Sequence, residues 1–82
     1  IQISAATFGG GLVAGVALTA AQLVVQAGSN ATSPAGVGQF IFNTTKSLLL
    51  WDADGSGGAN AVKIAKFSGL ASLATSDFEI IA

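Results

Sequence analysis

The first charged residue in this chain is Lys46, so the 45 residues before it carry no charged side chain. Charged residues make up only 9% of the sequence, compared with about 25% in an average globular domain. A surface so poor in charge gives little protection against association. The length of 82 residues allows one small domain, whose own core is marginal. We therefore expect other copies of the chain, or the rest of a larger protein, to cover much of its surface.

The residue types that usually stabilise small domains or perform catalysis are missing. The sequence has no Cys and no His, which excludes disulfides, Cys/His zinc sites, Ser-His-Asp triads and cysteine nucleophiles. Its three Lys and no Arg provide too little positive charge for nucleic-acid binding. We predict a protein that is not an enzyme and has no nucleic-acid partner. An ion bound by oxygen ligands, or association with other chains, remains as the means of stabilisation.

A short pattern occurs three times, in which an aliphatic residue is followed by small and polar residues and then by a large apolar residue. The copies are Ile3–Phe8, Leu18–Leu23 and Leu73–Phe78. We predict one short helical turn in each copy, anchored by its two apolar ends, and a brief strand after the second and third copies. Ser4 and Thr19 are residue types that favour the N-cap position of such a turn.

The composition changes between residues 28 and 38, where Gly, Ser, Asn, Pro and Thr predict an exposed loop. We expect a single small domain over residues 1–82. Within it, the loop separates an Ala/Gly-rich part (residues 1–27) from a hairpin-rich part (residues 39–82).

Two short apolar runs follow the loop, and five residues with turn-forming character join them. This spacing predicts a β-hairpin over residues 40–51. Both runs are continuous rather than alternating, so both faces of these strands should be covered. In so small a chain this points to a second sheet or another subunit. The residues that we assign to the core strands or to an assembly surface are Phe40, Ile41, Phe42, Leu48, Leu49, Leu50 and Trp51.

Further strands are predicted at Val62–Phe67 and at Phe78–Ile81, where Glu79 should lie on the face opposite Phe78 and Ile80. The expected fold is all-β. Short antiparallel strands and hairpins would form a small sandwich or roll, with a few short helical turns.

The segment Asp52-Ala53-Asp54-Gly55 is the one constellation with metal-binding character. Alternating carboxylates followed by Gly are typical of the start of a calcium loop with oxygen ligands, and Asn60 would add a side-chain oxygen. The twelfth position, however, is Lys63 rather than the bidentate Glu of an EF-hand. Two interpretations stay open: a calcium site at Asp52, Asp54 and Asn60, or a plain turn between two strands.

Residues 8–28 are uncharged and about long enough to span a bilayer. A membrane-spanning subunit is therefore one alternative. Three consecutive Gly at its start, interrupting polar residues and the lack of flanking Lys or Arg argue against it.

Residues 40–57, FIFNTTKSLLLWDADGSG, resemble the C-terminal region of bacterial type I-secreted proteins of the repeats-in-toxin, or hemolysin-type calcium-binding, group. The strand Ala61–Phe67 and the ending Leu73–Ile81 continue the resemblance, and Phe8 and Leu18–Val25 fit its upstream part, so it covers nearly the whole chain. It implies an uncleaved C-terminal secretion signal, carried here by Asp77, Phe78, Ile80 and Ile81. An ABC transporter complex would read this signal and export the chain to the cell exterior or surface.

This sequence departs from the family pattern in two places. Ser47 occupies a turn position where the family usually has Gly, so a positive φ there would be strained. The glycine-rich nonapeptide repeats that bind calcium in the group are absent, so calcium carries over only to Asp52 and Asp54.

We therefore expect a non-enzymatic extracellular structural module, exported by type I secretion and self-associating into a homo-oligomer, assembly or filament. The alternatives are a calcium-dependent C-terminal folding and secretion module of a larger protein, and the membrane subunit based on residues 8–28.

Overall fold

The computed structural model describes residues 1–57, 61–68 and 72–82. Within them the chain begins with β1 (Gln2–Ser4) and α1 (Ala5–Phe8). The 3₁₀ turn η1 (Ala20–Gln22) leads into β2 (Leu23–Gln26), and β3 (Gln39–Asn43) and β4 (Leu48–Asp52) follow. The remaining elements are β5 (Val62–Lys66), the 3₁₀ turn η2 (Thr75–Asp77) and β6 (Glu79–Ile81).

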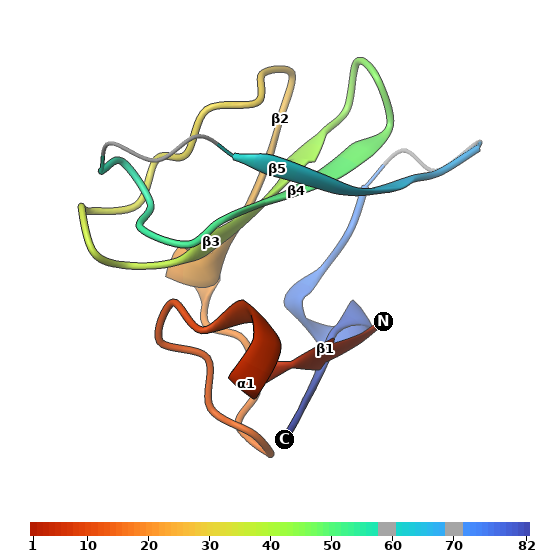
Figure 1. The fold of residues 1–82 in the computed structure, drawn as a ribbon. Coiled ribbons are helices and arrows are strands. Elements are labelled where there is room, and N and C mark those ends of the chain that lie inside the picture. The colour runs from red at the N-terminus through yellow and green to blue at the C-terminus, as the bar shows by residue number, and fades with distance from the viewer. Residues whose placement is uncertain (58–60, 69–71) are drawn as a thin grey trace.

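The strands form two sheets of unequal size. The larger has the order β2-β3-β4-β5, and the smaller pairs β1 with β6. In Figure 1 the larger sheet occupies the upper part of the molecule, and β1 and α1 lie below it near both chain ends. The prediction of a small β-rich fold with a few helical turns is thus confirmed.

The predicted hairpin is present. Strands β3 and β4 pair antiparallel from Asn43↔Leu48 to Gln39↔Asp52, and β4 pairs antiparallel with β5. Strand β5 ends at Lys66, one residue before the predicted end, and β6 begins at Glu79, one residue after the predicted start. The hairpin turn places Ser47 at φ 53°, the left-handed conformation expected at this position.

The expectation of antiparallel pairing throughout is wrong. Strand β2 runs parallel to β3, and β1 runs parallel to β6. A tight turn joins only antiparallel neighbours, whereas parallel neighbours need a connection that returns across the sheet. The segment after β2 is long enough for this return, and β1 and β6 come from distant parts of the sequence.

Residues 28–38 form the predicted loop, most of which is exposed, and this loop also makes the return from β2 to β3. Asn43 donates from Nδ2 to Ser29 Oγ at 2.8 Å, and the side-chain oxygen of Gln39 accepts from the backbone N–H of Thr32 at 2.7 Å. The segment therefore crosses the face of β3 that carries Gln39, Ile41 and Asn43. All five residues of β3 are buried, with no second subunit involved.

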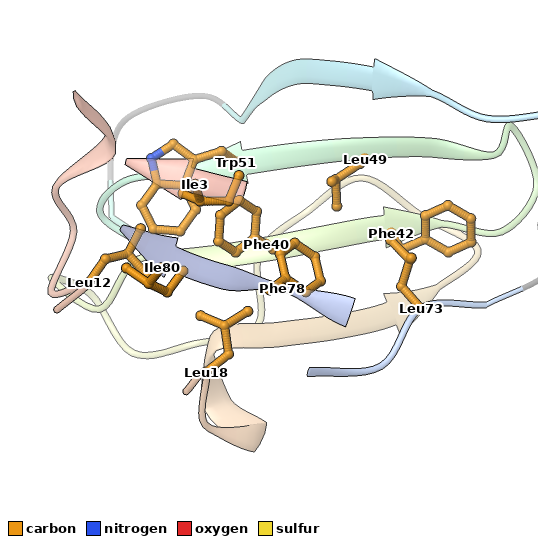
Figure 2. Close-up of a cluster of buried hydrophobic side chains, with 10 residues drawn as sticks. All are labelled: Ile3, Leu12, Leu18, Phe40, Phe42, Leu49, Trp51, Leu73, Phe78 and Ile80. Atoms are coloured by element: carbon orange, nitrogen blue, oxygen red, sulfur yellow. The ribbon is translucent and has the colours of Figure 1, made fainter. Parts of the chain in front are cut away.

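The main core lies on the opposite face of β3 and β4, where the small sheet packs against the large one. Figure 2 shows these side chains converging from both sheets and from the segments between them. The ring centroid of Phe40 lies 4.5 Å from that of Trp51 and 4.9 Å from that of Phe78. The residues of this core are Ile3, Leu12, Leu18, Phe40, Phe42, Leu49, Trp51, Leu73, Phe78 and Ile80.

The three predicted helical turns are all present, as α1, η1 and η2; the second leads directly into β2, and the third is separated from β6 by Phe78 alone. Ser4 Oγ accepts a hydrogen bond from Thr7 N at 3.3 Å, as an N-cap should. At the second turn the two positions exchange roles, so that the residue before the turn supplies the backbone N–H and the last residue of the turn supplies the side-chain oxygen. Thr19 N donates to Gln22 Oε1 at 2.8 Å. The third turn repeats this arrangement, because Ala74 N donates to Asp77 Oδ2 at 2.8 Å.

Residues 8–28, the alternative membrane segment, consist of the last residue of α1, turns, η1 and β2 rather than one helix. In the part of the chain that the structure describes, no helix has the length and apolar character needed to cross a membrane.

Candidate functional site

The two aspartates singled out in the sequence lie where β4 ends and a turn begins. Asp52 is the last residue of β4 and is 4% exposed. Gly55 N donates to Asp52 O at 3.3 Å, and Gly57 N donates to Asp54 O at 3.1 Å. Gly55 has φ 60°, a conformation that Gly adopts without strain. Residues 52–57 thus form the turn that the Asp-Gly sequence predicts.

Residues 33–38 pack against this turn. Gly36 N donates to Asp54 O at 2.9 Å, and Ser56 N donates to Ser33 O at 3.1 Å. A side chain at Gly55 would collide with Ser33 Oγ and with the carbonyl oxygens of Pro34 and Val37. The loop and the turn therefore fix each other's backbone, and the Asp54 carbonyl oxygen already accepts two hydrogen bonds.

The carboxyl groups of Asp52 and Asp54 lie close together. Burial is the main cause that raises the pKa of Asp52 above its ordinary value, and the hydrogen bond and negative charge of the Asp54 side chain raise it further. A backbone hydrogen bond from Asp54 N to Asp52 Oδ1, at 3.4 Å, acts in the opposite direction. Such a pair favours either a shared proton or a bound cation, because both relieve the repulsion between the carboxylates.

The described residues supply only part of a metal shell. Among them, no group of three or more acidic side chains is placed to hold an ion. Calcium takes six to eight oxygen ligands, and Asp52 and Asp54 supply two carboxyl groups. The third predicted ligand, Asn60, lies outside the described residues.

The apolar residues of β3 and β4, predicted to lie in the core or on an assembly surface, are largely buried within the chain itself. Phe40, Ile41, Phe42 and Leu49 are completely buried, Leu50 and Trp51 nearly so, and Leu48 is half-buried. Both β3 and β4 also have a neighbouring strand on each side. These two strands are therefore not available as a surface for assembly.

The proposed secretion residues lie in η2, in β6 and at Phe78 between them. Phe78 and Ile80 belong to the core, and Ile81 is partly exposed on the other face of β6. Glu79 lies opposite Phe78 and Ile80, as predicted. The carboxylate of Asp77 accepts a hydrogen bond from Ala74 N and so stabilises the turn.

The outer strands of the large sheet differ in chemistry. Strand β5 carries Lys63 and Lys66 and has an irregular register opposite Leu49/Leu50. Strand β2 has the sequence LVVQ, with no charge, and Val25 is 39% exposed. The sequence does contain the signal for β2, since Val24-Val25 continues the second helical-turn pattern, but only the sheet order reveals it as an edge.

Several valines are exposed outside the core. Val62 is 61% exposed, and Val13 and Val16 are also more than half exposed. Together with the few charges, these side chains give the surface an apolar character.

No family model, curated protein or solved structure matches this chain.

Proposed function

We propose that this protein is a non-enzymatic extracellular structural module that self-associates. In this proposal the two unequal sheets act as a small sandwich or roll, and the unit of assembly is the folded chain. The observation that carries it is the uncharged strand β2, which forms one edge of the large sheet among the described residues, on a molecule with exposed valines and few charges. Exposed strand edges accept strands from other chains unless charge, proline or a bulge protects them.

The export route rests on the resemblance of residues 40–57 and 73–81 to type I-secreted proteins. The expected result is export to the medium that depends on a type I ABC transporter complex. Secretion by cells with and without such a transporter measures it directly. Equal amounts of extracellular protein from both strains would contradict this part of the proposal.

Self-association is tested on the purified chain by light scattering coupled to size exclusion, followed by electron microscopy. We expect a mass above 8.0 kDa that rises with concentration. Because the β2 edge is uncharged, the association should persist in 0.5 M NaCl. At this ionic strength the Debye length is about 3–5 Å, so attraction between exposed charges contributes little. A monodisperse monomer at millimolar concentration would contradict the proposal.

A second candidate is a calcium-dependent folding and secretion module, favoured by the close approach of the Asp52 and Asp54 carboxyl groups. A bound cation would stabilise both carboxylates in their charged form. The expected result is a higher unfolding temperature in calcium but not in equimolar magnesium, with no calcium effect in Asp54→Asn. If calcium leaves the wild-type unfolding temperature unchanged, this candidate is wrong.

A further inference from the structure

We propose that two copies of the chain associate through their β2 strands, which pair antiparallel about a two-fold axis at Val24. This inference rests on the proposed self-association and specifies its first contact. It joins two four-stranded sheets into one sheet of eight strands, with β5 at each outer edge.

The first argument is the direction of the β2 backbone. Thr44 N donates to Gln26 O at 2.8 Å, and Gln26 is in register with Asn43 of the parallel neighbour β3. In a parallel pair, alternate residues of a strand direct both their N–H and their C=O toward the neighbour. Gln26 and Val24 therefore bond to β3, and Leu23 and Val25 direct their backbone groups away from it.

These outward groups have no backbone partner within residues 1–57, 61–68 and 72–82, where every backbone bond outside the sheet ladders connects other residues. Leu23 and Val25 thus offer two N–H donors and two C=O acceptors along one edge. An antiparallel strand forms hydrogen bonds in such pairs, with the residue between them facing its counterpart without a bond. The spacing of Leu23 and Val25 fits this pattern.

The second argument identifies the occupant as another copy of β2. In a two-fold contact each strand meets itself in reverse, so Leu23 pairs with Val25 of the other copy and Val24 faces Val24. All four outward groups on each copy are then satisfied. The two copies of Val24 lie side by side in this contact, and β-branched residues pair favourably across strands.

Charge favours β2 over β5 for this contact. A two-fold contact brings the same strand of the two copies together. Across a β5–β5 edge, Lys63 and Lys66 of one copy would therefore repel the lysines of the other copy. Strand β2 has no charge, and the chain around it is uncharged from residue 1 to residue 45. The nearest charge in the β3–β4 turn, Lys46, lies beyond the Gln26 end of β2, so the antiparallel arrangement puts the two copies of Lys46 at opposite ends of the interface.

The first test uses Val25→Pro, which removes an outward N–H and leaves the bonds from β2 to β3 in place. We expect the fold to persist, as shown by the fluorescence of the buried Trp51, and the dissociation constant to rise about tenfold or more, since each dimer loses two N–H donors. Val25→Lys keeps the N–H but adds charge at the same edge, and it should also weaken association. Val62→Lys adds the same charge to β5 and should leave the dissociation constant unchanged.

The second test uses the lack of Cys in the chain. Residues that face each other without hydrogen bonds in an antiparallel pair have Cα atoms about 4.5 Å apart, within the range that a disulfide spans. In a glutathione redox buffer, Val24→Cys should form a covalent dimer, and Val62→Cys should not do so at the same concentration.

The outcomes separate this inference from the proposed function. If the wild-type chain is a monomer, both are wrong. If the wild type associates but Val25→Pro and Val25→Lys associate equally well, or Val24→Cys crosslinks no faster than Val62→Cys, only the β2 contact is overturned. Weakened association of both Val25 variants, together with selective crosslinking at Val24, supports it.

Discussion

The indole of Trp51 lies directly against the backbone of Gly38. A Cβ atom at Gly38 would meet Cη2 of the Trp51 ring at 2.5 Å, closer than atoms can pack. Gly38 N donates to Gly10 O at 3.0 Å, and Gly10 packs against the same ring. The ring nitrogen, Nε1, donates to Phe8 O at 3.3 Å. Trp51 therefore joins the first segment of the chain to the large sheet.

Gly38→Ala should destabilise the protein by about 1–3 kcal/mol, because the added methyl group overpacks the core against Trp51. Gly28→Ala is the matched control, since a Cβ there meets nothing within 4 Å. Chemical denaturation monitored by Trp51 fluorescence measures both variants. Equal stability of the two would show that both the Trp51 ring and the Gly10 carbonyl group shift to accept the methyl group.

Asp52→Asn should change how stability depends on pH. The raised pKa of Asp52 means that the folded state favours its protonated form. Protonation of Asp52 therefore contributes fully to the free energy of unfolding below the ordinary Asp pKa of about 4. This contribution is lost as the pH rises through the raised pKa of Asp52. The variant should therefore be more stable than wild type at pH 7 and have a flatter pH profile between pH 4 and 7.

Denaturation midpoints across this pH range provide the measurement for Asp52. Glu79→Gln removes a carboxylate from an exposed position on β6 and is the control. A wild-type profile that Asp52→Asn leaves unaltered would contradict the assigned role of Asp52.

Ser47→Gly should stabilise the protein, because Ser47 has φ 53° and Gly reaches this conformation without the steric cost of a Cβ atom. The expected gain is about 0.5–1 kcal/mol after the greater freedom of Gly in the unfolded chain is included. Ser47→Ala removes the hydroxyl but keeps the Cβ, so the difference between the two variants in thermal unfolding isolates the backbone contribution. If Gly is no better than Ala, the turn is not strained.

A hydrogen bond from a backbone N–H to a side-chain oxygen closes each of the two 3₁₀ turns, η1 and η2, and a substitution can remove it. Gln22→Ala and Asp77→Ala each remove a side-chain acceptor for a backbone N–H, and each should cost about 0.5–1 kcal/mol. Asp77→Asn keeps an oxygen in place and should lose less than Asp77→Ala. Equal losses in the two Asp77 variants, measured by denaturant titration, would indicate that charge rather than the hydrogen bond matters.

Local sequence patterns predicted much of the fold. The apolar runs with a turn between them gave the β3–β4 hairpin, and the threefold pattern gave α1, η1 and η2 with the strands that follow the latter two. These features depend on residues that are close together in the sequence. The left-handed conformation of Ser47 was indicated only by the resemblance, in which Gly usually occupies this turn position.

The long-range features were not predictable in this way. Continuous apolar residues at 40–42 indicated that both faces of the strand are covered, but not that residues 28–38 provide one cover. That assignment depends on β2 lying parallel to β3, which no local pattern encodes. The same limit applies to the candidate sites: the Asp52–Asp54 turn is visible in the sequence, whereas the position of β2 at the edge of the sheet follows from the order of the described strands.

The pairing of β1 with β6 bears on the order of folding. Ile1 N donates to Asp77 O at 2.7 Å across a separation of 76 residues, whereas β3 and β4 are joined by a short turn. Closing so long a loop costs conformational entropy before any contact repays it. We expect the hairpin to form early and the small sheet to close last, so the chain passes through a stage in which the Phe40 and Trp51 face of the large sheet is still uncovered.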